Sequence, residues 1–372
     1  MQIQDLVPLA PLHTFSLQTH ARRVISVESE QDLIQLFEEG VLNQPFLILG
    51  EGSNTIFLSS IEETILKITI QGIDSPKADG TPLLSQTSKM ESVNSQSNVL
   101  VSAGAGVNWD EFVQWTIHHN LGGVENLSLI PGTCGAAPVQ NIGAYGVELS
   151  DVFHSLTCFD IRTGEVKTMS KEECRFAYRD SVFKYPVEEG GLKGVMIILS
   201  ITLALTPKIK YEPEVSYQGL MDELARQGAD PQSVPDIMQV REAICAIRRY
   251  KLPDPKDVPN SGSFFKNPII SSELAEILLL RYPDLPYYKM DDKRVKIPAG
   301  WLIEQIGWKG KMSGAVGTWP KQALVLIQNG KATGQELNHF IERLQSSVRH
   351  TFNIELEPEV NLIGMETLPT HG

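Results

Sequence analysis

The pattern of apolar residues along the chain predicts several strands. Residues 45–50 form a continuous apolar run between proline and glycine, PFLILG, which predicts a buried strand. Residues 64–70, TILKITI, alternate and are rich in β-branched side chains, which predicts a second strand. Further strand-like runs occupy residues 99–101, 155–160, 195–205 and 323–328.

Helix signals alternate with these strands. Asn108 and Glu111 are spaced like a capping box, and Gly122 is predicted to take the left-handed position after the helix that follows. Another helix is predicted over residues 235–250, with Pro235 in its first turn. It ends in basic residues, which favour the negative end of a helix dipole.

The end of the chain has the clearest periodicity. A helix is predicted to begin with the capping pair Thr333 and Glu336. Its apolar face consists of Leu337, Phe340, Ile341, Leu344 and Val348. Residues 354–362 then alternate strictly, which predicts a strand with one polar face. The polar positions are Glu355, Glu357, Glu359 and Asn361. Because strands and helices interleave without an internal repeat, the predicted class is α+β or mixed α/β.

Residues 71–98 change the picture locally. They hold many Ser, Gln, Lys, Pro and Asn residues and few large apolar ones. This composition predicts a long exposed loop or insertion and a candidate domain boundary. We assign it no function.

Length and charge limit the class of protein. A chain of 372 residues exceeds what one hydrophobic core usually serves, so two or three domains are predicted. The net charge of −13 argues against non-specific binding to nucleic acid or to anionic membranes. An anionic ligand would therefore need positive charge gathered locally.

Neither the N-terminus nor the cysteines indicate an extracellular protein. The first residues lack a signal-peptide pattern, and the longest apolar run, residues 195–205, is too short to span a membrane. Four cysteines occur, Cys134, Cys158, Cys174 and Cys245, and none forms a CxxC pair. We expect a cytoplasmic protein with buried, reduced thiols and no metal site.

Two glycine-containing segments are candidates for cofactor binding. LGEGSN, residues 49–54, follows a predicted strand, and its backbone could approach a diphosphate closely; a plain tight turn is the alternative. The spacing is not GxGxxG. Residues 130–146, IPGTCGAAPVQNIGAYG, hold four glycines and few charges, which favours backbone lying flat against a rigid ligand.

Further motifs carry charged and polar groups. In FAYRDSVFK, Arg179 lies among aromatic and apolar residues, so its guanidinium needs an anionic partner; a structural salt bridge with Asp180 is the alternative. KLPDPK and GSFFKNP combine rigid loop residues with basic and amide groups that suit phosphates and sugar hydroxyls. For the serines of GSFFKNP the alternative is a purely local role, because most loop serines only cap a helix or stabilise a turn. For the glutamates of residues 355–359 the alternative is a solvent-exposed strand face.

The order of these motifs is specific. LGEGSN, IPGTCGAAPVQNIGAYG, FAYRDSVFK, KLPDPK, GSFFKNP, AGWLIEQ and LEPEVNLIG follow one another along the chain. Together they resemble the UDP-N-acetylenolpyruvoylglucosamine reductase family, from about Thr14 to about Gly364. The residues near Tyr217 are similar to the form of the family that covers its substrate with a tyrosine loop.

The resemblance implies an α+β fold with three domains. Two are subdomains of an FAD-binding fold of the vanillyl-alcohol-oxidase type, and the third is an additional α+β substrate-binding domain. The implied boundaries are 1–70 for the first subdomain, 71–251 plus 352–372 for the second, and 252–351 for the substrate domain.

The resemblance also implies the reaction and its residues. NADPH would reduce non-covalent FAD, and hydride would pass to the enolpyruvyl group of a UDP-sugar, which a serine protonates. The matching catalytic positions are Arg179, Ser263 and Glu359. The substrate positions are Tyr178, Tyr217, Lys251, Lys266, Asn267 and Gln322. The cofactor positions are Leu49, Gly50, Glu51, Gly52, Ser53, Asn54, Pro131, Gly132, Gly135, Ala136, Ala137, Gln140, Asn141, Ile142 and Gly143.

One departure and two alternatives accompany this interpretation. Family members often carry Ser-Ser where this chain has Ala136 and Ala137, so a hydroxyl contact to the cofactor is lost. The alternatives are an alcohol-oxidising flavoenzyme on the same scaffold and a non-catalytic binder of flavin or UDP-sugar. The residues do not indicate whether NADPH or NADH is the preferred donor. A monomer is expected.

Overall fold

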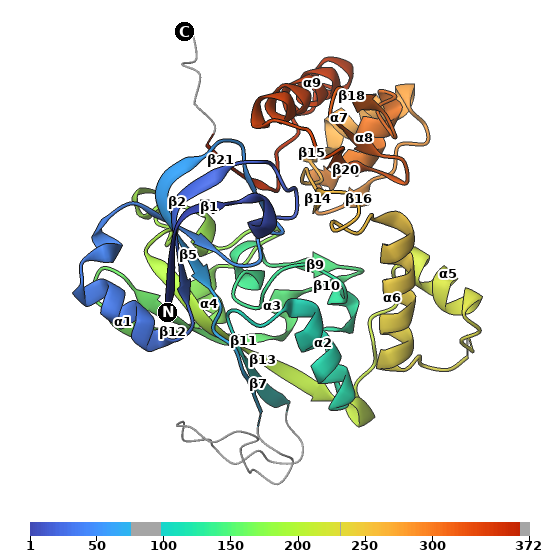
Figure 1. Ribbon diagram of the computed structural model, residues 1–372. Helices are drawn as coiled ribbons and strands as arrows, with labels where there is room; N and C mark the ends of the chain where they lie inside the picture. Colours follow the sequence, from blue (N-terminus) through green and yellow to red (C-terminus); the bar gives the residue numbers. More distant parts are fainter. Residues whose placement is uncertain (76–97, 231, 365–372) are drawn as a thin grey trace. The chain divides into compact units, whose positions relative to one another are not determined.

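The computed structural model describes residues 1–75, 98–230 and 232–364 (Figure 1). The chain folds as two compact units. The first unit comprises Met1–Asp5, Arg23–Glu51 and Glu63–Arg248, and the second comprises Leu6–Arg22, Gly52–Glu62 and the chain from residue 249 onward. Both units combine helices with mainly antiparallel sheets, which confirms the α+β class. The predicted three-domain boundaries stay a prediction.

Two sheets dominate the first unit. One has the strand order β1-β2-β5-β3, and the other has the order β12-β11-β13-β7-β6 with β8 paired to β13. Its strands are β1 Gln2–Pro8, β2 His20–Val27, β3 Phe46–Leu49, β5 Ile61–Ile68, β6 Ile73–Asp74, β7 Val99–Gly104, β8 Leu121–Gly122, β9 Gly143–Ala144, β10 Val147–Glu148, β11 Phe153–Asp160, β12 Glu165–Ser170 and β13 Met196–Pro207. Its helices are α1 Glu30–Glu38, α2 Trp109–His118, α3 Leu149–Val152, α4 Lys171–Cys174, α5 Gln218–Arg226 and α6 Ile237–Lys251.

The second unit has smaller sheets and three helices within the described part of the chain. The sheet orders are β14-β20-β19-β18, β15-β17-β16 and β21-β4. The strands are β4 Thr55–Phe57, β14 Asn260–Ser263, β15 Ile269–Ser271, β16 Tyr288–Lys289, β17 Arg294–Lys296, β18 Met312–Ser313, β19 Val316–Trp319, β20 Gln322–Gln328 and β21 Asn361–Ile363. The helices are α7 Ser272–Arg281, α8 Ala299–Gln305 and α9 Gly334–Phe352.

The strands predicted over residues 45–50, 64–70, 99–101, 155–160, 195–205 and 323–328 are present, with one correction. Among the described strands, β3 lies at one end of its sheet order and pairs, in parallel, with β5 alone. Leu49 is buried, but Ile48 is 39% exposed. The prediction of a fully buried strand was therefore wrong, because a strand with a single neighbour leaves part of its surface uncovered. Of the polar segment 71–98, residues 73–74 form β6 and residues 76–97 lie outside the described part of the chain.

Capping residues set the ends of the helices. The Asn108 side chain accepts a hydrogen bond from the amide of Glu111 at the start of α2, which is one of the two bonds of the predicted capping box. Asn120, with φ of 57°, takes the left-handed position after that helix. The prediction for Gly122 was wrong: it lies in β8, where a Cβ would stand 2.1 Å from the Tyr211 ring. Small size, not left-handed backbone, is what this position requires.

Of the other two helix predictions, the start of one was wrong and the capping of the other is confirmed. α6 begins at Ile237, so Pro235 precedes the helix and is not in its first turn. In α9, Thr333 and Glu336 form the predicted reciprocal capping box, and all five predicted apolar positions are buried. In the final alternating segment burial alternates from Ile354 to Glu357, but Pro358 and Glu359 are both half-buried, and only Asn361–Ile363 forms a strand. The preceding residues Glu357 and Glu359 each make one backbone bond, to residues 266 and 264.

Each unit has its own core. In the first, side chains of β7, β11 and β13 pack with those of α2. A smaller cluster joins α5 to α6 (Figure 1). In the second, Phe15, Leu17 and Ile56 from the early chain pack with residues of α8, α9 and β20. All four cysteines are buried thiols that form no disulfide, as predicted.

Candidate active site

In the first unit, the two glycine-containing segments meet. The amide of Gly132 donates to Oε2 of Glu51 at 2.8 Å, which joins the residues after β3 to the glycine-rich stretch. A Cβ on Gly50 would stand 2.8 Å from Oγ1 of Thr133 and 3.6 Å from Cβ of Ala136. Gly50 is therefore small because the two segments approach closely, and Glu51 serves as the link between them.

The glycine-rich stretch runs along the end of β7. Its residues Cys134 and Gly135 donate backbone hydrogen bonds to Val107 and Ala105, both at 2.9 Å. A Cβ on Gly135 would stand 2.5 Å from that of Ala105. Burial raises the pKa of the Cys134 thiol, so this group stays protonated and is a poor nucleophile. The segment thus presents backbone and small side chains, which fits a rigid, non-covalently held cofactor.

Asn141 fixes the far end of this stretch. It has a left-handed backbone with φ of 44°. Its Nδ2 donates to Oε2 of Glu148 at 2.9 Å and to the carbonyl of Ala177 at 3.1 Å, and its Oδ1 accepts from the amide of Ser150 at 2.9 Å. The predicted cofactor residue therefore holds the stretch to the segment that carries Arg179.

Arg179 is held from several sides. It has φ of 53°, and its side chain is 18% exposed. Its guanidinium donates to the carbonyl of Gly143, lies 3.8 Å from a carboxylate oxygen of Glu148, and stacks over the Tyr178 ring at 5.1 Å from the centroid. Asp180 instead accepts from the hydroxyl of Tyr185 at 2.6 Å. The partner of Arg179 in this unit is thus Glu148, not Asp180, and the motif alone did not indicate it.

Tyr217, immediately before α5, is 39% exposed. Its ring meets that of Tyr145 edge-on, with centroids 5.3 Å apart and an interplanar angle of 89°. Tyr145 is the last residue but one of the glycine-rich stretch. The predicted substrate loop and the predicted cofactor segment are therefore in direct contact within the first unit.

In the second unit, the structure places Ser263 and Glu359 on neighbouring backbone segments. Ser263, exposed at the end of β14, pairs with Val325 of β20. The next residue, Phe264, is buried and accepts a hydrogen bond from the amide of Glu359 at 2.8 Å. Nδ2 of Asn54 donates to the Glu359 carbonyl at 3.2 Å. Two predicted catalytic residues and one predicted cofactor residue thus share one region of this unit.

The rest of the LGEGSN motif is fixed in the same unit. Gly52 has φ of 74°, and a Cβ there would stand 2.0 Å from the carbonyl oxygen of Leu12. The amide of Thr14 donates to the Gly52 carbonyl at 3.2 Å, and its hydroxyl donates to the Ser53 carbonyl at 3.4 Å. Only glycine meets both requirements at this position, that is, a left-handed backbone and no side chain.

The predicted substrate residues of the second unit make structural contacts as well. Lys266 forms an ion pair with Glu357. Oδ1 of Asn267 accepts from the amide of Ala299 at 2.9 Å, which fixes the start of α8. Gln322 opens β20, and its Oε1 accepts from the amide of Leu324 at 3.3 Å. These bonds orient the three side chains on one unit.

Comparisons with known proteins show the family of the chain. Residues 254–363 match the family described as UDP-N-acetylenolpyruvoylglucosamine reductase, C-terminal domain, and residues 21–170 match the FAD binding domain family. The UDP-N-acetylenolpyruvoylglucosamine reductase of Pseudomonas aeruginosa is 41% identical over 368 residues, which cover 97% of this chain and 99% of that protein. The chain belongs to the UDP-N-acetylenolpyruvoylglucosamine reductase family. It is therefore an oxidoreductase and an FAD-containing flavoprotein of peptidoglycan precursor synthesis.

Solved structures agree on the fold of this reductase family member. The UDP-N-acetylenolpyruvylglucosamine reductase of Thermus caldophilus matches with a TM-score of 0.63 at 20% identity, covering 98% of this chain and 99% of that one. The 6-hydroxy-D-nicotine oxidase of Arthrobacter nicotinovorans matches with a TM-score of 0.50 at 13% identity, covering 97% and 88%. The predicted oxidase-type FAD-binding fold is thus confirmed. Family membership also decides against the alcohol-oxidising and non-catalytic alternatives.

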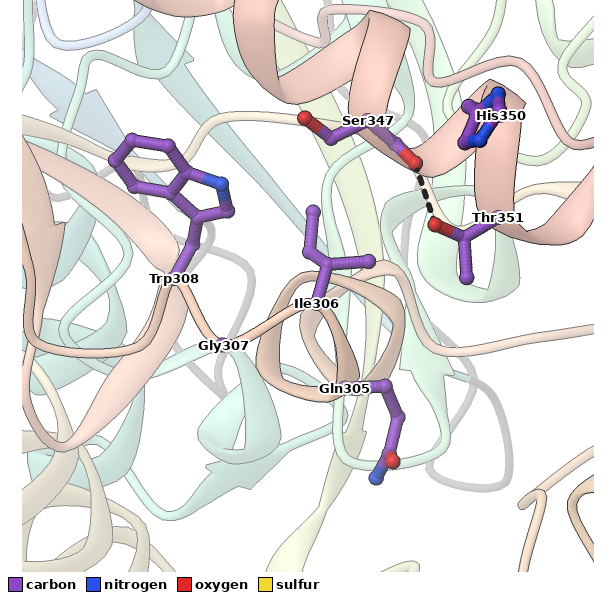
Figure 2. Close-up of a pocket in the computed structure, with 7 residues that line it drawn as sticks. All are labelled: Gln305, Ile306, Gly307, Trp308, Ser347, His350 and Thr351. Atoms are coloured by element: carbon purple, nitrogen blue, oxygen red, sulfur yellow. Dashed lines mark hydrogen bonds between the residues drawn. The ribbon is translucent and has the colours of Figure 1, made fainter.

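A pocket of about 490 Å³ in the second unit is not part of the candidate site of this reductase (Figure 2). It is lined by Gln305, Ile306, Gly307, Trp308, Ser347, His350 and Thr351. The Thr351 hydroxyl donates to the Ser347 carbonyl at 2.9 Å within α9. None of the predicted site residues lines this pocket. Within the described ranges, no helix is long and apolar enough to cross a membrane.

Proposed function

We propose that the chain reduces the enolpyruvyl group of UDP-N-acetylglucosamine enolpyruvate to give UDP-N-acetylmuramate, with NADPH as hydride donor and FAD bound non-covalently. The observation that carries this proposal furthest is the backbone bond between Glu359 and Phe264. It supports a shared role for Glu359 and Ser263, which come from distant parts of the sequence. Family membership supports the substrate and the donor.

FAD, when bound, supplies hydride transfer between NADPH and the terminal enolpyruvyl carbon. Negative charge then develops on the neighbouring carbon and spreads onto the substrate carboxylate. A preorganised cation at that carboxylate lowers the barrier, because oriented charges in a dry site are usually the largest catalytic contribution. We assign this role to Arg179, whose planar guanidinium suits a carboxylate. Glu148 and the Gly143 carbonyl orient it.

Ser263 donates the proton that completes the reduction. A neutral hydroxyl is a weak acid in water, but it only has to protonate a far more basic carbon. Glu359 assists at the same centre. The bond from Asn54 to the Glu359 carbonyl holds the backbone of this residue.

The remaining predicted substrate residues bind the UDP-sugar; they are Tyr178, Tyr217, Lys266, Asn267 and Gln322. Lys251 also belongs to this set, and it supplies the local positive charge that a chain of net charge −13 needs for an anionic ligand. The FAD contacts are the cofactor positions of the two glycine-containing segments. We also propose the three-domain division 1–70, 71–251 with 352–372, and 252–351, a monomeric state, and a cytoplasmic location.

The visible spectrum of the purified protein tests this proposal. We expect a yellow protein whose flavin is released by acid, bleached by NADPH, and recoloured by the enolpyruvyl sugar. In Ser263→Ala, NADPH should bleach the flavin at the parent rate, whereas recolouring by the sugar should slow by at least about 10²–10³-fold, as when one donor to a developing anion is removed. Ser263→Cys should retain part of the rate.

Ser261→Ala is the matched control, since Ser261 lies on the same strand and is buried. It should recolour at the parent rate. Recolouring of Ser263→Ala at the parent rate, or a loss confined to the NADPH step, would show that Ser263 is only a loop residue.

A further inference from the structure

A short turn before the glycine-rich stretch has no role in the function proposed above. It is the 3-10 turn Glu125–Leu127, and it holds two fully buried polar residues, Glu125 and Asn126, which are 0% and 1% exposed. Burying polar side chains is costly unless they form hydrogen bonds. The bonds of these residues therefore indicate what the turn is for.

Asn126 joins two distant segments. Its Nδ2 donates to the carbonyl of Tyr145 at 2.9 Å and to the carbonyl of Glu214 at 2.8 Å. Tyr145 lies near the end of the glycine-rich stretch, and Glu214 lies three residues before Tyr217. Both acceptors are backbone carbonyls, so the side chain at position 126 must supply two donors at once. An amide does this, whereas a carboxylate of the same shape supplies none.

The tyrosine loop is tied down around this bridge. Oε1 of Glu214 accepts from the amide of Ser216 at 2.7 Å, directly before Tyr217. A Cβ on Gly146 would stand only 3.1 Å from Cγ of Glu214. The Tyr217 ring then meets the Tyr145 ring edge-on at 5.3 Å. The same two segments are thus held together by a backbone bridge and by a ring contact.

The Tyr211 ring holds the other end of the loop. It packs beside Gly122, next to the point where Oε2 of Glu125 accepts from the amide of Gly123 at 2.8 Å. The Tyr211 ring fills the space that a side chain at Gly122 would need. The loop from Tyr211 to Tyr217 is therefore anchored at its start by the packing of the Tyr211 ring against Gly122 and near its end by the bonds of Asn126.

We propose that Asn126 is a positioning residue for the UDP-sugar: it holds the loop that carries Tyr217 against the glycine-rich stretch, so that Tyr217 is in place before the nucleotide binds. This inference rests on the proposed function, in which Tyr217 contacts the substrate. Without the bridge, the loop would have to become ordered when the nucleotide binds. The entropy lost in ordering the loop would then weaken the binding.

The test uses FAD-loaded protein and UDP as the probe, with Kd measured by titration calorimetry. Asn126→Asp places a carboxylate against two carbonyl oxygens, and Asn126→Ala removes both donors. Both variants should raise the Kd for UDP by about tenfold, since the two lost bonds are each worth a few-fold. Bleaching of the flavin by NADPH should keep its parent rate.

Ser128→Ala is the matched control. Ser128 is buried, and its hydroxyl bonds to the Glu125 carbonyl at 2.6 Å within the same turn. This variant should lower the melting temperature and leave the Kd for UDP unchanged. A purely structural role of Asn126 would give the same pattern as Ser128→Ala, and that result would overturn the proposal.

A second variant separates this inference from the proposed function. Tyr217→Ala alone should weaken UDP binding, and adding Asn126→Ala to it should change Kd by less than about twofold, because the two residues act through one loop. If Tyr217→Ala weakens binding but Asn126→Ala does not, only the inference fails. If Tyr217→Ala binds UDP like the parent, the proposed role of Tyr217 fails.

Discussion

A single methyl group at Gly143 should reduce turnover by displacing Arg179. A Cβ at this position would stand 2.8 Å from Nη1 of Arg179 and 2.9 Å from Cγ of Glu148. Ordinary contacts begin near 3.4 Å, so the guanidinium has to move by about 0.6 Å. A misplacement of about 1 Å costs about 10²-fold in rate, so we expect a loss of about tenfold in kcat for Gly143→Ala.

Steady-state kinetics with NADPH and the enolpyruvyl sugar measure this loss, and thermal melting of the same preparations checks that the fold is intact. Gly143 does not have a left-handed backbone, so alanine should cost little stability. In an Arg179→Ala background, Gly143→Ala should have almost no further effect, because the group it displaces is gone. Parent-level kcat in the single variant, or the same tenfold loss in both backgrounds, would refute the reasoning.

Three further predictions concern stability and binding. Burial opposes ionisation of Asp110, but hydrogen bonds from Arg241 and from the amide of Leu129 outweigh it and lower the pKa of Asp110. Asp110→Asn leaves Arg241 buried without its charged partner and should destabilise the fold by about 3–5 kcal/mol in urea unfolding at pH 7. A carboxylate whose pKa is lowered on folding stabilises the folded state fully only above the ordinary pKa of a carboxyl group. The difference in stability between the parent and Asp110→Asn should therefore shrink as the pH falls through the pKa of folded Asp110. A difference that stays constant with pH would contradict the role given to the Asp110–Arg241 pair. Thr333→Ala removes the cap of α9 and should cost about 1 kcal/mol; an unchanged denaturation midpoint would show that the cap is dispensable. Lys251→Ala should raise KM for the UDP-sugar with little change in kcat, and the reverse pattern would argue against phosphate binding in the ground state.

Local patterns predicted the local structure well. The capping box and apolar face of α9 are as predicted because both depend on residues within a few turns of each other. The segment before β21 shows where this approach ends. Its alternation matches the buried positions Ile354, Leu356 and Val360, although Pro358 and Glu359 are both half-buried. A strand also needs a neighbour, and residues 264 and 266 supply only isolated bonds. Register with a distant partner is not encoded in an alternating pattern.

The same limit applies to the site. Arg179 was predicted to need an anionic partner, but Glu148 and the Gly143 carbonyl come from another segment, and the adjacent Asp180 was the more obvious choice. Asn126 was not singled out at all. A signal was present, since Glu125, Asn126 and Ser128 interrupt an otherwise apolar run at residues 121–130. Only the fold identifies the carbonyls that Asn126 meets.

The division of each unit into separate stretches of chain has a consequence for synthesis on the ribosome. The chain passes between the two units five times, and the core of the second unit includes Phe15, Leu17 and Ile56. β4 pairs in parallel with β21, whose residue Asn361 lies opposite Thr55. These early residues leave the ribosome long before their partners exist, so the second unit cannot complete its fold until translation is nearly finished. Contacts of such long sequence separation form slowly, and a chain released before residue 361 should expose apolar residues from both of its ends.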